Sequence, residues 1–337
     1  VGRNAEIKEL AFHISYIFRE HPSLPNFIVF GTVGTGKSTC LNYVIEELIK
    51  TAKDKKVNLK VVKIKGSENK TKHEILKKIL SVIEPTIPIP ITTSDIYNKI
   101  ISTLAFKGFF VLIFIDEIHE IRESELNGTL YTISRLGGDI SFHKERGGGR
   151  ILDNKKGKVG YILISNDANI RNKLKDNTKS SLTRETIIFK RYKPSQIVEI
   201  LKSRIEEGAL YNNKIKDGVL DYIASVSVNQ GQDARYALLL LNKLAKEGEK
   251  RNVDLLDINL CQEVNEKLLQ DYMKDIIREQ PNFYLEILLI ISDLYKRGED
   301  LNSKTIWDEY QLRRYLPNVN FSRISQIVTS MERDGII

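Results

Sequence analysis

The sequence predicts a parallel α/β sheet domain followed by two helical domains. Short apolar runs alternate with amphipathic stretches as far as residue 192, which is typical of strands buried on both faces and joined by helices. A glycine-rich segment separates the first apolar run from the helix that follows it, and beyond residue 192 only helical patterns occur. We therefore expect domains at residues 1–192, 193–275 and 276–337.

The expected strands of the first domain are short, apolar and rich in branched or aromatic residues. They are Phe27–Phe30, Leu59–Ile64, Phe109–Ile115, Tyr161–Ile164 and Thr186–Phe189. The expected helices alternate with these strands and carry apolar residues at helical spacing. They are Asn4–Glu20, Thr39–Lys53, Lys72–Ile83, Ser94–Phe106 and one helix after Asp116. A long, basic, glycine-rich loop is expected at residues 137–158.

The rest of the chain is predicted to be helical. A small all-α domain is expected from four helices, the first opening at Pro194 and the others at Asp217–Val228, Ala234–Lys250 and Asp257–Leu269. Three more helices follow at Phe283–Tyr295, Lys304–Tyr315 and Ser322–Glu332, and then the turn Asp334-Gly335. This order is typical of a winged helix-turn-helix that is cut off at its wing. An ordinary three-helix bundle is the alternative.

Charge is unevenly distributed along the chain. The net charge is +8 and the pI is about 9.1. Residues 50–78 and residues 143–191 each carry a net charge of +8, so the remainder carries −8. Two basic belts indicate either a polyanionic partner or a lysine-rich solvated surface, and charge alone does not separate these interpretations.

Hydrophobicity and cysteine content exclude other classes of protein. The longest apolar run, Phe109–Ile115, is too short to span a membrane, and no signal peptide is visible. We therefore expect a cytoplasmic protein with no membrane partner. Cys40 and Cys261 have no metal-ligand or redox spacing, and a disulfide is not expected.

The segment Gly31–Ser38 matches the phosphate-loop pattern G-x-x-x-x-G-K-[ST] at every fixed position. It lies between an expected strand and an expected helix, so backbone N–H groups and the helix N-terminus would surround phosphate oxygens. Lys37 is expected to reach the β- and γ-phosphates, and the Ser38 hydroxyl to bind Mg²⁺. The cofactors predicted are therefore ATP or ADP with Mg²⁺. The predicted contacts are Gly31, Val33, Gly34, Thr35, Gly36, Lys37, Ser38 and Thr39.

Polar residues follow two later strands of the predicted sheet. Asp116 and Glu117 come directly after the apolar run that ends at Ile115. Because the carboxyl ends of parallel strands face the ligand, Asp116 is expected to hold Mg²⁺ and Glu117 to polarise the attacking water. Asn166 follows the next strand, where its side chain would bond the γ-phosphate or that water. A simple turn is the alternative for Asn166.

Arg235 is expected in the first turn of a helix, after Gly231-Gln-Asp233-Ala. A cation at that position opposes the helix dipole, so another reason for it is needed. Reaching a triphosphate would supply that reason, and a plain surface arginine is the alternative.

These motifs together resemble those of the AAA+ replication initiators of the origin recognition complex and cell division control protein family, in their archaeal form. The resemblance covers essentially the whole chain, and its Ser-Ser-Leu and Gly-x-Asp-Ala-Arg segments are the most discriminating. The matching residues are Val1-Gly-Arg3, Gly31–Ser38, Asp116-Glu117, Ser165-Asn166-Asp167, Lys179-Ser-Ser-Leu182, Phe189 with Tyr192, and Gly231-Gln-Asp-Ala-Arg235.

The resemblance implies an AAA+ core, a helical lid domain and a DNA-binding winged helix. It makes Asn166 the first sensor residue and Arg235 the second, beside the catalytic pair Asp116 and Glu117. It places the adenine between the segment Val1–Arg3 and Tyr192. It also implies that ATP acts mainly as a conformational switch and is hydrolysed slowly.

The chain departs from the family pattern in three places. His119 stands where an aspartate is usual, and Asn177-Thr178 stands where Arg-Val is usual. An arginine able to act on a neighbouring subunit is therefore missing, with Lys179 or Arg184 as candidate substitutes. The expected loop at residues 137–158 is the third departure, either an added DNA contact or an insertion.

The last expected helix would enter the major groove of DNA by its N-terminal end. Outward residues there are suited to base edges, and two arginines before the helix are suited to phosphates. Residues 281–337 nevertheless carry a net charge of −1. The predicted DNA contacts are Arg313, Arg314, Ser322, Arg323, Ser325 and Gln326.

Three functional hypotheses follow. The first is an ATP-dependent replication initiator that binds origin duplex DNA through the winged helix and the AAA+ domain, alone, as a homo-oligomer or beside a paralogous subunit. The second is a protein that binds ATP and scarcely turns it over. The alternative class is a signalling or transposition-type P-loop ATPase whose C-terminal helices bind protein.

Overall fold

The computed structural model describes most of the chain, namely residues 2–86, 92–146, 157–209, 214–229, 233–313, 317 and 319–333. Some sequence predictions lie outside these ranges: Val1, Gly231 with Gln232, residues 147–156 of the expected loop, Arg314 and the Asp334-Gly335 turn. The chain forms two compact units, Val1–Asn212 with Leu220–Leu239, and Asn213–Val219 with Leu240–Ile337.

The first unit contains a five-stranded parallel sheet. Its strands are β1 (Asn26–Gly31), β2 (Leu59–Lys65), β3 (Phe110–Asp116), β4 (Lys158–Ser165) and β5 (Thr186–Phe189). They lie in the order β2-β3-β4-β1-β5, and every neighbouring pair is parallel. The predicted parallel sheet is confirmed, and β4, the strand that precedes Asn166, lies beside β3.

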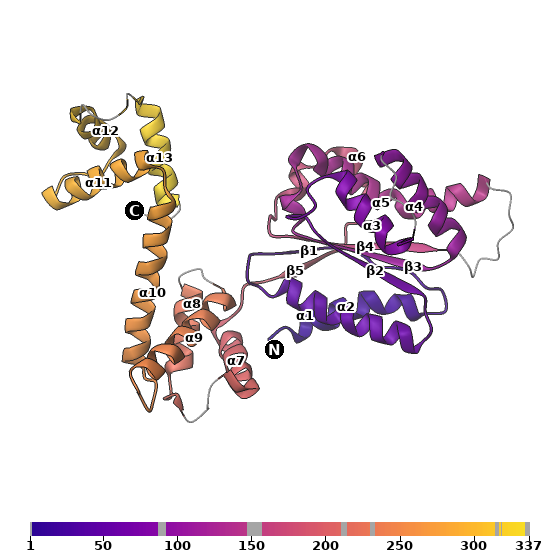
Figure 1. The fold of residues 1–337 in the computed structure, drawn as a ribbon, viewed down its shortest axis with the longest axis horizontal. Coiled ribbons are helices and arrows are strands. Elements are labelled where there is room, and N and C mark those ends of the chain that lie inside the picture. Colours follow the sequence, from indigo (N-terminus) through magenta and orange to yellow (C-terminus); the bar gives the residue numbers. More distant parts are fainter. Residues whose placement is uncertain are drawn as a thin grey trace. The chain divides into compact units, whose positions relative to one another are not determined.

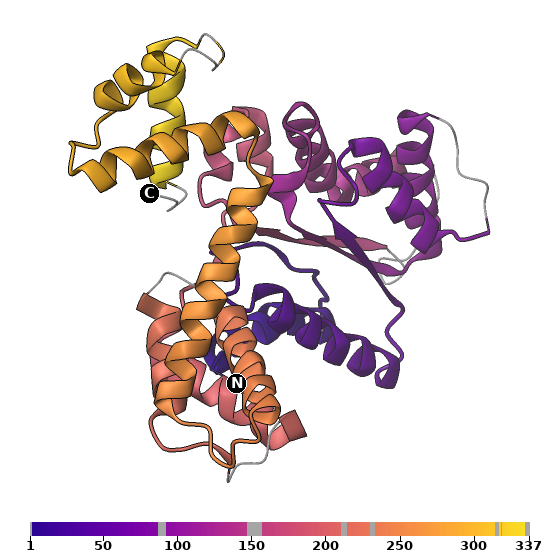
Figure 2. The same ribbon diagram turned by 60° about the vertical axis from the view of Figure 1, so that its left-hand side comes forward.

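Helices cover both faces of this sheet (Figure 1). Phe27 and Val29 of β1 share a core with α1 (Asn4–Ser15) and α2 (Lys37–Asp54), whereas Ile28 lies in the core on the opposite face. This second core contains α3 (Lys72–Ile83), α4 (Thr93–Lys107) and α5 (Glu123–Arg146), and Figure 2 shows the layers from another side. Burial of both faces explains why the strands are continuous apolar runs.

The helix α5 is longer than the sequence predicts. A loop is expected at residues 137–158, but α5 passes through Gly137–Gly138 and ends only at Arg146. Each helical glycine costs roughly 1 kcal/mol relative to alanine, which is why local propensity predicts a loop. Burial offsets this cost, because the apolar stripe continues on both sides of the glycines with Ile133, Leu136 and Ile140 in the core.

The first unit continues with shorter elements. The helix α6 (Asp176–Ser181) lies between β4 and β5. After β5, α7 (Pro194–Arg204) has its proline at the first helical position, where the missing N–H has no helical partner to lose. A π-helical segment, Ile205–Ala209, ends α7, and α8 (Val219–Asn229) follows.

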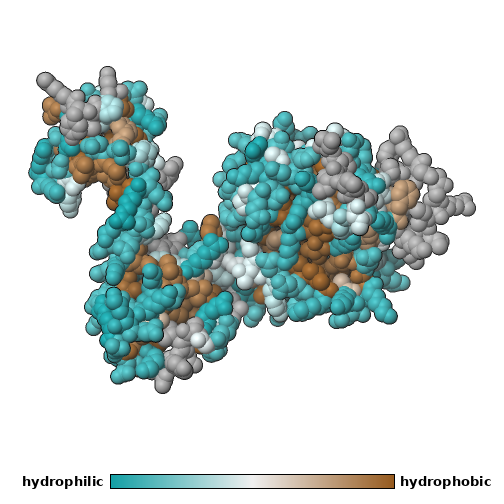
Figure 3. Space-filling model, viewed as in Figure 1, coloured by the Kyte–Doolittle hydropathy of each residue, from teal (hydrophilic) through white to brown (hydrophobic). Residues whose placement is uncertain are grey.

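Helices alone form the rest of the described chain. The helix α9 (Ala234–Lys250) has the predicted bounds, and α10 (Ile258–Glu279) runs without interruption past the domain boundary expected at residue 275. Exposed polar and charged residues cover the middle of α10, which is the teal stretch in Figure 3. None of the helices in the described ranges is long and apolar enough to cross a membrane.

The last three helices form a small bundle with its own core. They are α11 (Asn282–Arg297), α12 (Ser303–Leu312) and α13 (Phe321–Arg333). The stripe predicted to be buried on α13, namely Ile324, Ile327, Val328 and Met331, lies in this core. These helices fit the expected winged helix, whose wing would lie beyond the described residues.

Candidate functional site

Three predicted segments meet at the carboxyl edge of the sheet. The phosphate loop follows β1, Asp116 ends β3, and Ser165 ends β4, which lies between those two strands. The Ser38 hydroxyl, in the first turn of α2, donates a hydrogen bond of 2.6 Å to Oδ2 of Asp116. This bond joins the two most informative motifs of the sequence, which lie far apart along the chain.

The phosphate loop has the backbone conformation that its glycines permit. Gly34 and Gly36 have φ values of +69° and +83°, in the region that favours glycine. The Thr35 hydroxyl donates to the carbonyl of Thr32 over 2.9 Å and closes the turn. Val33 and Thr39 are exposed. The loop thus leads directly into α2, whose first N–H groups have no helical partner.

Lys37 is buried beneath this loop. Its ammonium donates to the carbonyls of Gly31 and Thr32 over 2.8 and 2.7 Å. Burial lowers the pKa of Lys37, the Asp116 carboxylate raises it, and the nearby Arg235 and Arg3 lower it again. The ammonium is therefore held at the loop by neutral carbonyls, within reach of an anion bound there.

The oxygen atoms beside the loop suit Mg²⁺. Mg²⁺ takes oxygen donors and is usually held by one or two carboxylates together with water and phosphates. Asp116 supplies one carboxylate and Ser38 supplies a hydroxyl in contact with it. No group of three or more His, Cys, Asp or Glu side chains that could hold a metal occurs in the described part of the chain. A site completed by phosphate and water agrees with this composition.

Glu117 is held by a segment that the sequence did not single out. The Ser67 hydroxyl donates to Oε2 of Glu117 over 2.6 Å, and the Gly66 N–H donates to the Asp116 carbonyl over 2.7 Å. Glu117 itself has a φ of 57°, which is uncommon for a residue other than glycine. The turn after β2 therefore orients the predicted catalytic carboxylate. A serine just after the end of a neighbouring strand was the only signal for this role.

Asn166 follows β4 as predicted, but it forms a hydrogen bond through its backbone N–H and not through its side chain. The Asn166 N–H donates to Nδ1 of His119 over 3.4 Å. The next residue, Asp167, pairs with Lys173 at 2.9 Å, and this hydrogen bond lowers the pKa of Asp167. His119, noted only as a departure from the family pattern, thus contacts the segment that carries Asn166. Among the described residues the Asn166 amide has no hydrogen-bond partner, so it is available to a ligand.

Arg3 and Tyr192, both expected near the adenine, contact each other directly. The Arg3 guanidinium lies 4.0 Å from the centroid of the Tyr192 ring and is 2% exposed. An ideal Cβ on Gly36 would lie 2.3 Å from the Tyr192 hydroxyl, so this tyrosine borders the phosphate loop. The separation of 4.0 Å leaves no space for a base between the two side chains. A base bound there would therefore require Arg3 to move.

The start of α9 also borders the phosphate loop. An ideal Cβ on Gly34 would lie 1.6 Å from Oδ2 of Asp233. The other carboxylate oxygen of Asp233 accepts bonds of 2.8 and 3.3 Å from the N–H groups of Arg235 and Tyr236, and so caps α9. Arg235 lies close enough to lower the pKa of Lys37. Sequence reasoning identified Arg235 but missed Asp233, whose helix-capping pattern was the available signal.

The position of the missing arginine is accessible. Asn177 is exposed on α6, while Thr178 is 1% exposed and its hydroxyl lies 3.5 Å from the Asn127 carbonyl. Thr178 is therefore buried where the resemblance implies a valine, and Asn177 is exposed where it implies an arginine. Of the two candidate substitutes, Lys179 pairs with Asp176 of its own helix at 3.6 Å, and Arg184 is exposed.

The predicted DNA contacts differ in their availability. Ser322, Arg323 and Gln326 are exposed on α13, and Ser325 is half-buried. Arg313 is only 16% exposed, because its guanidinium bonds Asp293 over 2.6 Å inside the bundle. The Arg313 guanidinium thus already forms an ion pair within the bundle. Arg323 is exposed and is the more accessible of the two arginines for a DNA contact.

Two known families match this chain. Residues 25–152 match the family described as "AAA domain", and residues 198–263 match "Cdc6 AAA+ ATPase-type lid domain". The first range contains the phosphate loop and the Asp116-Glu117 pair, and the second contains α8 and α9. Fold and site together define an AAA+ P-loop protein with a lid domain.

Known relatives place the chain more narrowly. It is 28% identical over 346 residues to the ORC1-type DNA replication protein of Pyrococcus abyssi, which covers 99% of this chain and 78% of the relative. The structure of the Aeropyrum pernix ORC1 protein in complex with DNA superposes with a TM-score of 0.72 at 22% identity, covering 99% and 83%. Cdc6p from Pyrobaculum aerophilum gives a TM-score of 0.65 at 17% identity, covering 99% and 86%. The resemblance seen in the motifs is therefore confirmed: over 99% of its length the chain is similar to archaeal replication proteins of the ORC1 type, and its lid residues match the Cdc6 family model.

Proposed function

We propose that this protein binds duplex DNA at replication origins and that ATP or ADP at the phosphate loop sets its conformation. The hydrogen bond between Ser38 and Asp116 carries the nucleotide half of the proposal, because it assembles oxygen donors for Mg²⁺ beside the loop. The DNA half is supported by the exposed polar face of α13 and by the replication proteins among the relatives. The domains that serve these roles are residues 1–192, 193–275 and 276–337.

The chain's own residues account for nucleotide binding. The N–H groups of the loop and of the first turn of α2 donate to phosphate oxygens, and Lys37 neutralises the β- and γ-phosphates. Ser38 and Asp116 hold Mg²⁺, which reduces the charge on the phosphates. Arg3 and Tyr192 border the base, with Arg3 moving aside to admit it. These assignments extend to the loop residues Gly31, Val33, Gly34, Thr35, Gly36 and Thr39.

Slow hydrolysis follows from the remaining polar groups. Glu117, oriented by Ser67, accepts a proton from the attacking water as the water oxygen bonds to the γ-phosphorus. The bond from that phosphorus to the ADP oxygen breaks, and ADP and phosphate result. Asn166 and Arg235 stabilise the charge on the transferred group. Asn177 supplies no positive charge to the ATP site of a neighbouring subunit, so the rate of ATP hydrolysis stays low. The bound nucleotide then serves mainly to set the conformation of the protein.

Asp233 connects the nucleotide to the lid. Its carboxylate packs against Gly34, where the phosphates of a nucleotide would bring further negative charge. Repulsion between like charges then displaces the start of α9, while Arg235 attracts the same phosphates. Occupancy of the loop thereby changes the position of α9, a helix of the proposed lid.

Binding to origin DNA tests the whole proposal. We expect the purified chain to bind an origin duplex more tightly than a random duplex in a mobility-shift assay at low salt, and Arg323→Ala to weaken that binding. Lys37→Ala should remove any effect of ATP on the binding. Equal and negligible affinity for both duplexes would overturn the proposal and favour a P-loop ATPase whose C-terminal helices bind protein.

ATP turnover distinguishes a slow hydrolase from a protein that only binds ATP. We expect a low steady rate of phosphate release that Glu117→Gln abolishes. A rate that the substitution leaves unchanged would mean that this site binds ATP without hydrolysing it. A paralogous subunit or a second copy of the chain is the proposed neighbour on DNA, and sedimentation of the DNA complex would show either one.

A further inference from the structure

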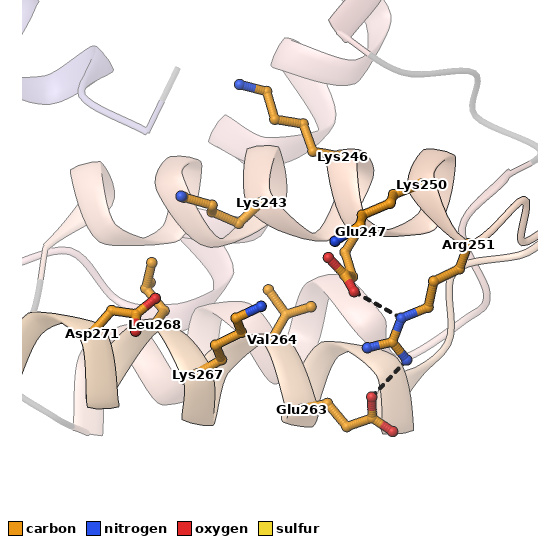
Figure 4. Close-up of a pocket in the computed structure, with 10 residues that line it drawn as sticks. All are labelled: Lys243, Lys246, Glu247, Lys250, Arg251, Glu263, Val264, Lys267, Leu268 and Asp271. Atoms are coloured by element: carbon orange, nitrogen blue, oxygen red, sulfur yellow. Dashed lines mark hydrogen bonds and ion pairs between the residues drawn. The ribbon is translucent and has the colours of Figure 1, made fainter.

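A groove lies in the second unit, outside the nucleotide site and the DNA-binding face. It runs between the C-terminal half of α9 and the first half of α10 and encloses about 230 Å³ (Figure 4). The small-molecule sites of proteins occupy about 300–1,000 Å³, so this groove is too small to enclose a nucleotide. Its basic lining residues are Lys243, Lys246, Lys250, Arg251 and Lys267.

The charges in this groove are only partly compensated. Arg251 donates to Glu247 and to Glu263 over 2.8 Å each, and its hydrogen bond lowers the pKa of Glu247. Within the described residues none of the four lysines forms a hydrogen bond or an ion pair. At one end of the groove, Arg251 and the two glutamates neutralise one another's charge. The four lysines keep a positive charge that no ion pair among the described residues compensates.

The lysines have the spacing of one helix face. Lys243, Lys246 and Lys250 lie at positions i, i+3 and i+7 of α9, which spans about 10 Å at 1.5 Å per residue. Lys267 extends from α10 toward α9, whereas the ammonium of Lys246 is drawn on the side of α9 away from α10 (Figure 4). The floor between the helices is apolar, with Val264 buried and Leu268 half-buried. The groove thus combines an apolar floor with a cationic rim.

We infer that this groove binds an acidic amphipathic helix of a partner protein. Carboxylates at i, i+3 and i+7 of such a helix repeat at the spacing of the three lysines on α9, and an apolar residue on the same face reaches Leu268. A duplex fits less well, because its charged phosphate backbone has no apolar side chain to place against Val264 and Leu268 on the floor of the groove.

A designed peptide tests this inference on the whole chain. The probe is a fluorescein-labelled helical peptide of 16 or so residues with glutamates at i, i+3 and i+7 and one leucine on the same face. We expect saturable binding by fluorescence anisotropy, and a loss of at least tenfold in affinity in Lys243→Glu/Lys267→Glu. The same peptide with lysine in place of glutamate should not bind.

Matched variants distinguish peptide binding in the groove from non-specific attraction of the peptide to the positive charge of the chain. Lys296→Glu/Lys304→Glu changes exposed lysines outside the groove by the same charge and should bind the peptide as the native chain does. Lys250→Ala is the milder variant, with a smaller loss expected if the double variant fails to fold. Absence of peptide binding, or an equal loss in the control variant, would overturn the inference. Displacement of the peptide by a duplex through the same lysines would instead make the groove a nucleic-acid site.

Discussion

The substitution Gly34→Ala tests the contact between the phosphate loop and Asp233 at the start of α9, because it adds a methyl group at that contact. An ideal Cβ there would lie 1.6 Å from Oδ2 and 2.2 Å from Cβ of Asp233, far inside contact distance. Gly34 also has a φ of +69°, a conformation that costs an L-residue roughly 1–2 kcal/mol. Displacing Asp233 removes the cap of α9, which is worth about 1 kcal/mol. Gly34→Ala should therefore lower the free energy of unfolding of the first unit by about 2–3 kcal/mol.

The matched control is an alanine at Gly138. This glycine lies within α5, and a Cβ there would meet nothing within 4 Å. Gly138→Ala should raise the free energy of unfolding by about 0.5–1 kcal/mol, because alanine is the better helix former.

Urea unfolding would measure both variants, and titration with a fluorescent ATP analogue would measure binding. We expect Gly34→Ala to lose at least tenfold in affinity for the analogue, since the loop must change shape, and Gly138→Ala to bind as the native chain does. Native stability and native affinity in Gly34→Ala would refute the contact with Asp233.

Three further predictions address hydrolysis and DNA binding. Ser67→Ala should slow single-turnover ATP hydrolysis by about tenfold with unchanged nucleotide affinity, because Glu117 loses the hydroxyl that donates a hydrogen bond to it. An unchanged rate would show that this hydrogen bond does not orient the carboxylate. Arg323→Ala should weaken origin binding by about 1–3 kcal/mol in a mobility-shift titration with no change in melting temperature, and a protein that unfolds earlier would point to a structural role. Asn177→Arg should raise ATP turnover with increasing protein concentration, and a rate per subunit that does not depend on concentration would contradict a role between subunits.

Local patterns were sufficient for the phosphate loop and the sheet. The glycines, Lys37 and Ser38 lie within one short segment, and their geometry follows from a turn between a strand and a helix. The apolar runs predicted strands correctly because both faces of a parallel sheet are buried, so no alternation was needed. The same local reasoning ended α5 too early at Gly137–Gly138, because burial of its apolar stripe outweighs the weak helix propensity of glycine.

Local sequence patterns do not predict contacts between segments that lie far apart in the chain. The position of Ser67 after a strand and the capping pattern of Asp233 do not by themselves identify Glu117 and Gly34 as partners, since each pair meets only once the sheet and its helices have packed. Arg313 is another such case. Its position before α13 suits a phosphate contact, which stays a prediction, and only the bundle shows that its guanidinium pairs with Asp293.

The class of the protein, the phosphate loop, the Asp116-Glu117 pair and the order of strands and helices along the chain can all be read from local sequence patterns. These depend on residues that are close in the chain, where spacing and backbone preference decide the geometry. Packing between distant segments sets which side chains orient that chemistry and which lysines, among the described residues, have no hydrogen bond or ion pair. Ser67, His119 and Asp233 reach the site through folding, and the lysines between α9 and α10 gather for the same reason. Hydrogen bonds and ion pairs act over a few ångströms in space, whatever the distance along the chain.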